Sequence, residues 1–185
     1  YPVRREFFDL DGAAARRNLG LDANGKVVLV FGGSGGARVI NEALVRALPL
    51  LKGLHGLTIL HITGRYAGPD YNAVRDTRRA VEALKLGDEL GSWYRCIEYM
   101  GDIHEAYAAA DLVVCRGGAG TLTELGVGGK PALIVPLATA AEDHQAANAR
   151  EMERLGAAGV LYQQAVWQQG EIVNCVDPDA LTERL

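Results

Sequence analysis

Short apolar runs alternate along this chain with longer segments in which apolar residues recur every three or four positions. The runs are rich in valine, isoleucine and leucine and do not alternate with polar residues, which indicates strands buried on both faces. The longer segments have the spacing of helices that bury one stripe of side chains. The predicted strands are 26–31, 57–62, 95–99, 112–115, 131–135 and 160–162, and the predicted helices are 37–51, 71–86, 103–110, 121–127, 142–155 and 178–185.

This alternation of strands and helices predicts an α/β fold, a Rossmann-like doubly wound parallel sheet. No linker, repeat or low-complexity tract divides the chain. In such sheets, ligands bind at the carboxyl ends of the strands. Two glycine-rich segments, 32–36 and 117–120, each follow a predicted strand, so both are expected at that edge.

Composition narrows the possible partners. The 185 residues include 23 glycines, well above the usual share of roughly 7%, but 6 prolines and 49% hydrophobic residues indicate many tight turns around a core. A net charge of −4 without a block of lysine or arginine argues against nucleic acid as a partner. No apolar run approaches the roughly 18–20 residues of a transmembrane helix, and no signal peptide is expected.

The cysteines Cys96, Cys115 and Cys175 lie far apart and form no CxxC pair. Free thiols in a reducing cytoplasm are the simplest interpretation, and neither a metal site nor a cofactor is expected. Among the histidines, His55 and His104 are expected at the surface and His61 in the core. Trp93, Tyr94 and Trp167 are expected to be packing residues, or one of them to cover an interface with another domain.

The first glycine segment suits a phosphate. Small residues between a strand and a helix let backbone N–H groups approach a ligand, and the helix adds its positive end. A tight turn without a ligand is the alternative. The segment ends Gly36-Ala37-Arg38, which excludes the Gly-Lys-Ser/Thr of a P-loop and breaks a dinucleotide fingerprint at Arg38. The acid that this fingerprint needs after the second strand is also missing.

A nucleophile elbow is the rival interpretation of this segment. Gly32-x-Ser34-x-Gly36 fits the pattern at a strand–helix turn, with Ser34 as nucleophile, and Asp111 and His144 follow in the order of a hydrolase triad. Against it, an elbow normally follows several strands, and only one predicted strand precedes Ser34.

Two polar features accompany the second glycine segment. Glu124 lies one turn into the following helix, where its carboxylate could hold a ribose diol or simply complement the helix dipole. The segment 142–145, Glu-Asp-His-Gln, follows the fifth strand and Pro136. It could bind sugar hydroxyls through its His and Gln side chains, cap the next helix through its acids, or do both.

Four motifs in this order resemble the MurG family of peptidoglycan N-acetylglucosaminyltransferases. They are Pro2-Val3-Arg4; Gly32-Gly33-Ser34-Gly35-Gly36-Ala37-Arg38 with Asn41; Cys115-Arg116-Gly117-Gly118-Ala119-Gly120-Thr121-Leu122-Thr123-Glu124; and Pro136 with Glu142-Asp143-His144-Gln145 and Asn148-Ala149. The resemblance implies a GT-B fold, in which two Rossmann-like domains hold the active site between them. Residues 1–185 would then be the C-terminal UDP-sugar (donor) binding domain, with the N-terminal acceptor domain absent from this sequence.

The resemblance also implies roles for individual residues around UDP-N-acetylglucosamine. The glycine loop would cradle the diphosphate, Tyr99 and Met100 would lie at the uracil, Glu124 would hold the ribose, and His144 with Gln145 would contact the sugar. Glycines at 117 and 120, where the family often carries side chains, suggest a more flexible second loop. The full set of implied substrate-binding residues is Arg4, Gly33, Ser34, Gly35, Gly36, Tyr99, Met100, Gly118, Ala119, Glu124, His144 and Gln145.

The implied activity is inverting transfer of N-acetylglucosamine to lipid I, a lipid-linked muramyl-pentapeptide, forming lipid II. The catalytic base is expected in the absent domain, and no residue here is assigned to it. The implied location is the cytoplasm, at the cytoplasmic face of the inner membrane. A related GT-B enzyme with another lipid or natural-product acceptor, and a nucleotide-binding module without catalysis, remain alternatives.

Overall fold

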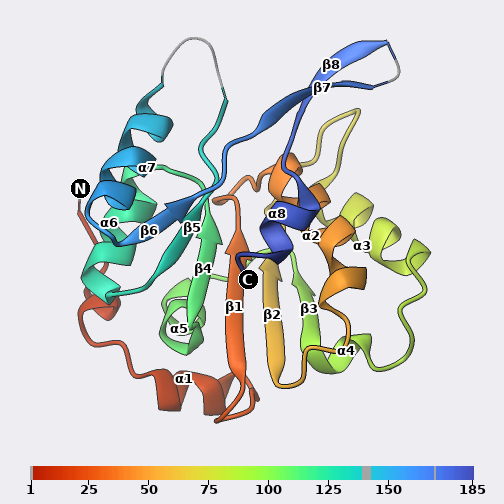
Figure 1. Cartoon of the computed structure of the whole chain (residues 1–185). Coiled ribbons are helices and arrows are strands. Elements are labelled where there is room, and N and C mark those ends of the chain that lie inside the picture. Colours follow the sequence, from red (N-terminus) through yellow and green to blue (C-terminus); the bar gives the residue numbers. More distant parts are fainter. Residues whose placement is uncertain (1, 139–142, 169) are drawn as a thin grey trace.

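The computed structural model describes residues 2–138, 143–168 and 170–185. Its centre is a six-stranded, entirely parallel sheet with the order β3-β2-β1-β4-β5-β6 (Figure 1). The sheet strands are Lys26–Phe31 (β1), Leu57–Ile62 (β2), Tyr94–Ile97 (β3), Leu112–Cys115 (β4), Ala132–Ile134 (β5) and Ala158–Val160 (β6). The predicted doubly wound sheet is thus confirmed.

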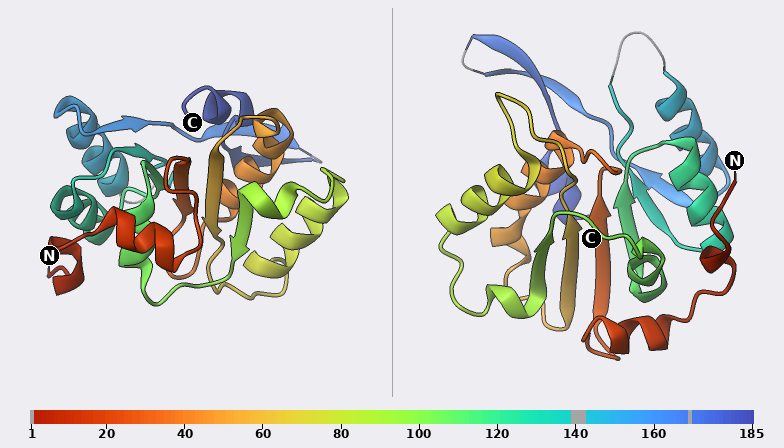
Figure 2. Two further views of the ribbon diagram at one scale, coloured as in Figure 1. Left: turned by 90° about the horizontal axis from the view of Figure 1, so that it is seen from below. Right: turned by 180° about the vertical axis from the view of Figure 1, so that it is seen from behind.

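Helices cover both faces of the sheet (Figure 2). They are α1 (Gly12–Asn18), α2 (Arg38–Leu51), α3 (Ala73–Ala83), α4 (Leu90–Trp93), α5 (Ile103–Ala109), α6 (Ala119–Gly128), α7 (His144–Arg154) and α8 (Pro178–Thr182), with a 3-10 turn η1 at Arg5–Phe8. Val28 and Val30 of β1 pack toward α2, whereas Leu29 and Phe31 pack toward α5 and α6. This two-sided burial explains why β1 has no polar alternation.

Some element boundaries differ from those predicted. Helix α6 begins at Ala119 rather than at 121, so the loop between β4 and α6 is only three residues long, 116–118. Helix α7 begins at His144, and Glu142 lies outside the described residues. The prediction also missed α1, η1, α4 and a two-stranded hairpin, Gln164–Gln168 (β7) with Glu171–Cys175 (β8).

The hairpin extends away from the sheet (Figure 1) and corrects one expectation about packing. Trp167 is 72% exposed and pairs across the hairpin with Ile172, which is 69% exposed. Trp167 is therefore not a core residue, whereas Tyr94 is buried as expected. His55 is exposed and His61 is fully buried, as predicted, but His104 is half-buried against Phe7.

The strand order reverses between β1 and β4, which makes this pair the switch point of the sheet. The first glycine loop follows β1 and the second follows β4. The two loops therefore flank the place where doubly wound sheets bind ligands.

Candidate functional site

A cavity of about 320 Å³ opens at the carboxyl edge of the sheet. It is lined by Arg4, Phe31, Gly33, Ser34, Ile62, Tyr99, Met100, Gly101, Ile103, Gly120, Thr121 and Glu124. Six residues predicted from the sequence meet in this lining, namely Arg4, Gly33, Ser34, Tyr99, Met100 and Glu124. They come from positions as far apart as residues 4 and 124, so only the fold brings them together.

The first glycine loop is packed tightly on the segment that follows β2. A Cβ on Gly36, whose φ is +86°, would lie 1.9 Å from the Thr63 carbonyl oxygen, and a Cβ on Gly64 would lie 2.2 Å from the Gly36 nitrogen. The loop carbonyls of Ser34 and Gly35 accept hydrogen bonds of 3.0 and 3.1 Å from the next two backbone N–H groups of that segment. Gly64 was not predicted; a glycine directly after a buried strand was its only signal.

The same loop presents free donors. Within the described part of the chain, the backbone N–H groups of Gly33, Ser34 and Gly35 donate no hydrogen bond, whereas that of Gly36 bonds to Gly33 O at 3.0 Å. Consecutive free N–H groups in a turn form a concavity that binds anions. The loop can therefore hold a phosphate without a side-chain cation of its own.

The second loop adds a helix N-terminus to the cavity. Gly118 is the N-cap of α6 and cannot cap it with a side chain, so the N–H groups of the first turn are left for a ligand. Gly120 and Thr121, in that first turn, line the cavity. The positive end of the α6 dipole is thus directed at the site.

The glycine at residue 117 was expected to make the second loop more flexible, but the structure gives this glycine a different role. A Cβ on the buried Gly117 would lie 2.5 Å from the Gln145 carbonyl oxygen, so the glycine is needed for close backbone packing. Asn148 also donates from Nδ2 to the Gly117 carbonyl at 3.1 Å. The loop is held against the start of α7 by both contacts.

Glu124 is the only carboxylate in the cavity lining as described. Its Oε2 accepts a hydrogen bond of 3.3 Å from the Tyr107 hydroxyl, and its Oε1 lies 3.9 Å from Arg4 Nη2. Burial raises the pKa of Glu124, while the Arg4 charge and the Tyr107 hydroxyl act in the opposite direction. A carboxylate offers about four lone-pair directions, so most acceptor capacity remains open to a ligand with hydroxyl groups.

Part of the cavity lining is apolar. Phe31, Ile62, Met100 and Ile103 form this part, and Tyr99, 42% exposed, stands at its rim. Apolar walls with a few convergent polar groups are typical of small-molecule sites. A flat heterocycle fits this part, while its polar substituents reach Glu124 and the glycine loop.

His144 and Gln145 do not line this cavity. They lie at the start of α7, next to the second glycine loop, and Gln145 Oε1 accepts a hydrogen bond of 3.1 Å from Leu137 N. Asp143 pairs with Arg150 and makes no side-chain cap in the described part of α7. The structure thus places these residues beside the site and leaves their contact with a sugar as a prediction.

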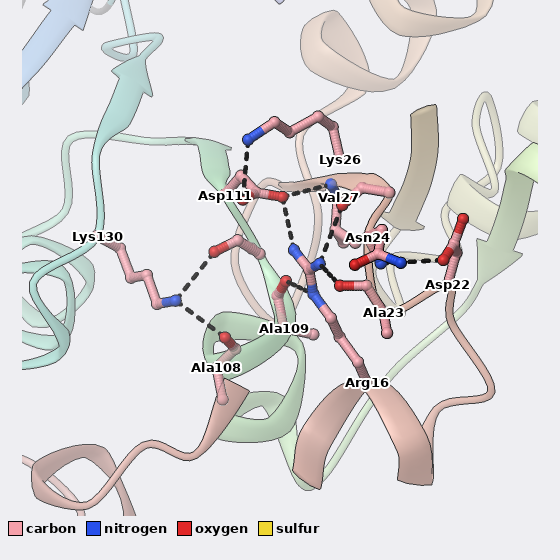
Figure 3. A network of polar contacts seen from close by, with 12 residues as sticks. Arg16, Asp22, Ala23, Asn24, Lys26, Val27, Ala108, Ala109, Asp111 and Lys130 are labelled. Carbon is pink, nitrogen blue, oxygen red and sulfur yellow. Dashed lines mark hydrogen bonds and ion pairs between the residues drawn. The ribbon is translucent and has the colours of Figure 1, made fainter. Parts of the chain in front are cut away.

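The hydrolase interpretation is wrong, because its triad is split between the two edges of the sheet. Asp111 precedes β4 and accepts hydrogen bonds of 2.7 Å each from Arg16 Nη2 and Val27 N, with Lys26 Nζ at 3.7 Å (Figure 3). Ser34 follows β1 at the carboxyl edge. A strand of this length separates the two edges by roughly 17–20 Å, so Asp111 cannot orient a histidine at Ser34.

The described residues contain neither a metal-ligand cluster nor a helix that could span a membrane. Over residues 2–138, 143–168 and 170–185, no three His, Cys, Asp or Glu side chains gather as metal ligands would. Within the same ranges, the helices are too short or too polar to cross a membrane.

The sequence matches the model of one protein family, described as the glycosyltransferase family 28 C-terminal domain, over residues 27–181. It is 38% identical over 163 residues to the "UDP-N-acetylglucosamine--N-acetylmuramyl-(pentapeptide) pyrophosphoryl-undecaprenol N-acetylglucosamine transferase" of Desulfitobacterium hafniense. This alignment covers 88% of this chain and 42% of the relative. A protein of the same name from Syntrophotalea carbinolica is 42% identical over 147 residues, or 78% of this chain and 37% of the relative.

The fold is similar to the crystal structure of MurG from Acinetobacter baumannii. The TM-score is 0.67 at 27% sequence identity, and the alignment covers 100% of this chain and 47% of that one. The chain therefore spans less than half the length of the relatives that it matches.

Proposed function

The chain belongs to the glycosyltransferase family 28 C-terminal domain family and has the Rossmann-like fold of one half of a GT-B enzyme. From this premise we propose that the chain is the donor-binding half of an inverting N-acetylglucosaminyltransferase. The donor is UDP-N-acetylglucosamine, the acceptor is lipid I, and the product is lipid II. The names of the curated relatives support this choice of substrates. The N-terminal acceptor domain would complete the active site.

The single observation that carries the proposal is the composition of one cavity lining. It joins an apolar wall, a partly desolvated carboxylate and two groups of free backbone N–H donors. A UDP-sugar has parts that match these three, namely a flat base, a ribose diol and a diphosphate.

In the proposed pose, the uracil lies at Tyr99 and against the main chain of Met100. The Glu124 carboxylate accepts hydrogen bonds from both ribose hydroxyls, which suits its open lone pairs. The diphosphate lies between the Ser34 loop and the N-terminus of α6. The sugar then extends past Gly118 and Ala119 toward the start of α7, where His144 and Gln145 would contact its hydroxyls.

The chemical step is a single displacement at the anomeric carbon. The acceptor hydroxyl oxygen attacks C1 of the sugar, the bond from C1 to the β-phosphate oxygen breaks, and UDP leaves with the bonding electrons. The loop N–H groups and the α6 dipole stabilise the charge that builds on the departing diphosphate. A base removes the acceptor proton. Glu124 is committed to the ribose in this pose, which leaves the base to the acceptor domain.

Calorimetric titration of the 185-residue chain with UDP-N-acetylglucosamine, UDP-glucose and UDP tests the donor assignment. Binding of UDP that weakens about 10-fold or more in Glu124→Gln, an isosteric variant without the charge, supports the ribose role. A chain that binds none of the three nucleotides would contradict the proposal. UDP affinity unchanged in Glu124→Gln would remove the ribose role alone.

A transfer assay tests the acceptor and the need for a second domain. The chain alone should transfer no sugar to lipid I, because the proposal assigns the base for the acceptor to the other domain. Lipid II formed once a family acceptor domain is supplied would support the proposed acceptor; transfer only to other lipids or natural products would favour a related GT-B activity. The proposed location is the cytoplasmic face of the inner membrane, where a lipid-linked acceptor is reached.

A further inference from the structure

Arg65 follows β2 and contacts two residues of the cavity lining, Ser34 and Tyr99, without lining the cavity itself. Its backbone N–H donates to Ser34 O at 3.0 Å, which fixes its position next to the loop. Its guanidinium carbon lies 3.4 Å from the centroid of the Tyr99 ring. The side chain thus bridges the part of the site assigned to the base and the part assigned to the diphosphate.

The Arg65 guanidinium has no counter-ion in the described part of the chain. No carboxylate lies within 4.0 Å of it, and it donates no side-chain hydrogen bond there. Neighbouring arginines differ in this respect, since Arg4 donates to Gly101 O and Arg38 donates to Glu42. Stacking on an aromatic ring uses the face of a guanidinium and leaves its in-plane N–H donors free.

The net charge of the cavity lining indicates which ligand group the Arg65 N–H donors would bind. The only charged residues in the lining as described are Arg4 and Glu124, and their charges cancel. The diphosphate of a UDP-sugar carries two negative charges, which the free backbone donors offset only in part. The Arg65 guanidinium, stacked on Tyr99 of this lining while its backbone is bonded to Ser34, is a source of the missing positive charge, and its fork geometry matches phosphate oxygens.

We propose that Arg65, held in place by its stacking on Tyr99, is a diphosphate-binding residue of the donor site. This inference rests on the proposed function, because it takes UDP-N-acetylglucosamine as the donor. On departure of UDP, the same guanidinium would neutralise the charge on the leaving diphosphate. The sequence carried no signal for this, since a single arginine after a strand is usually part of a solvated surface.

The test compares two ligands that differ only in phosphate. UDP and uridine are titrated against the wild-type chain, Arg65→Gln and the matched control Arg79→Gln, whose arginine is exposed on α3. Arg65→Gln should lower the affinity for UDP about 10-fold and leave that for uridine unchanged. Its UDP affinity should also depend less on salt, because one phosphate contact is lost. Arg79→Gln should match the wild type.

The outcomes separate this inference from the proposed function. If the wild-type chain does not bind UDP, the proposed function fails and the inference fails with it. If the wild type binds UDP and Arg65→Gln binds it equally well, or loses UDP and uridine to the same extent, only the Arg65 assignment is overturned. Should Arg65→Gln not fold, the Nε–H resonance of Arg65 in the wild type decides instead. Saturating UDP should shift it well beyond the shift that uridine causes by binding at Tyr99, and equal shifts with the two ligands would overturn the assignment.

Discussion

A fully buried histidine below the first glycine loop should make the stability of this domain dependent on pH. His61 Nδ1 lies 2.8 Å from the Tyr94 hydroxyl, and Nε2 lies 3.0 Å from Asn41 Oδ1. Asn41 Nδ2 donates to Thr63 O at 3.0 Å and to the Tyr71 hydroxyl at 2.9 Å, so Asn41 Oδ1 is an acceptor and His61 Nε2 carries the proton. The neutral ring is therefore fully satisfied, and burial lowers the pKa of His61 to about 3.

The sign of the effect follows from the two pKa values of His61. Its ordinary pKa is 6.5 and its folded pKa is about 3, so between these values the unfolded chain binds the additional proton. The stability contributed by the neutral ring is complete above pH 6.5 and is lost as the pH falls toward 3. Between pH 7 and pH 5 the loss from this residue alone is about 2 kcal/mol.

The comparison protein is His61→Gln, whose amide can donate to Asn41 and accept from Tyr94 but does not titrate in this range. Urea unfolding at pH 7, 6 and 5, followed by circular dichroism, gives the free energy of unfolding of both proteins. The wild type should lose about 2 kcal/mol more than the variant between pH 7 and pH 5. The remaining histidines are common to both proteins and cancel in the difference. If the free energies of unfolding of the two proteins fall by the same amount between pH 7 and pH 5, the claim that His61 is buried as a neutral ring is refuted.

Three further predictions concern the two edges of the sheet. Gly36→Ala should destabilise the domain by about 1–3 kcal/mol and weaken UDP binding, because the alanine would have to adopt a positive φ and would clash with a backbone carbonyl. The space around a Cβ at residue 35 is open, so the control Gly35→Ala should lower the free energy of urea unfolding by less than about 0.5 kcal/mol. Asp111→Ala should lower the free energy of unfolding by about 1–3 kcal/mol and leave UDP affinity unchanged, because it removes the acceptor of two hydrogen bonds far from the cavity. The ammonium of Lys26 is largely exposed, so the control Lys26→Met should change stability by less than about 0.5 kcal/mol. A loss in Lys26→Met equal to that in Asp111→Ala would contradict this account. Tyr107→Phe removes a hydroxyl that lowers the pKa of Glu124, so the pH below which UDP binding weakens should rise. Calorimetric titrations with UDP over a series of pH values measure this. If that pH is the same in the variant and the wild type, the Tyr107–Glu124 hydrogen bond is not made in solution.

The order of the elements and the edge that binds could both be predicted from local patterns. The strands at 26–31, 57–62 and 112–115 are mostly apolar, and the structure has them at these bounds. Crossovers between parallel strands are right-handed and their carboxyl ends meet at one edge. The two glycine segments had to lie there, whatever the sheet order proved to be.

The assembly of the site could not be predicted in the same way. Arg4 meets Glu124, and Arg65 meets Tyr99, across separations at which local patterns carry no information. Asp111 was considered as a triad acid on chain order alone, although its place directly before the strand predicted at 112–115 already puts it at the edge opposite Ser34. The hairpin β7–β8 was missed because its residues are mostly exposed and show no buried periodicity.

The sequence alone therefore determined the α/β class, the binding edge and the residue types available for a diphosphate and a diol. These depend on hydrophobic periodicity and on the backbone freedom of glycine, which are local properties of the chain. Tertiary structure decided which residues line the cavity, which glycines serve backbone packing, as at Gly64 and Gly117, and which charges remain without a partner. Those outcomes depend on long-range contacts and on desolvation, and both exist only once the sheet has formed and its helices have packed against it.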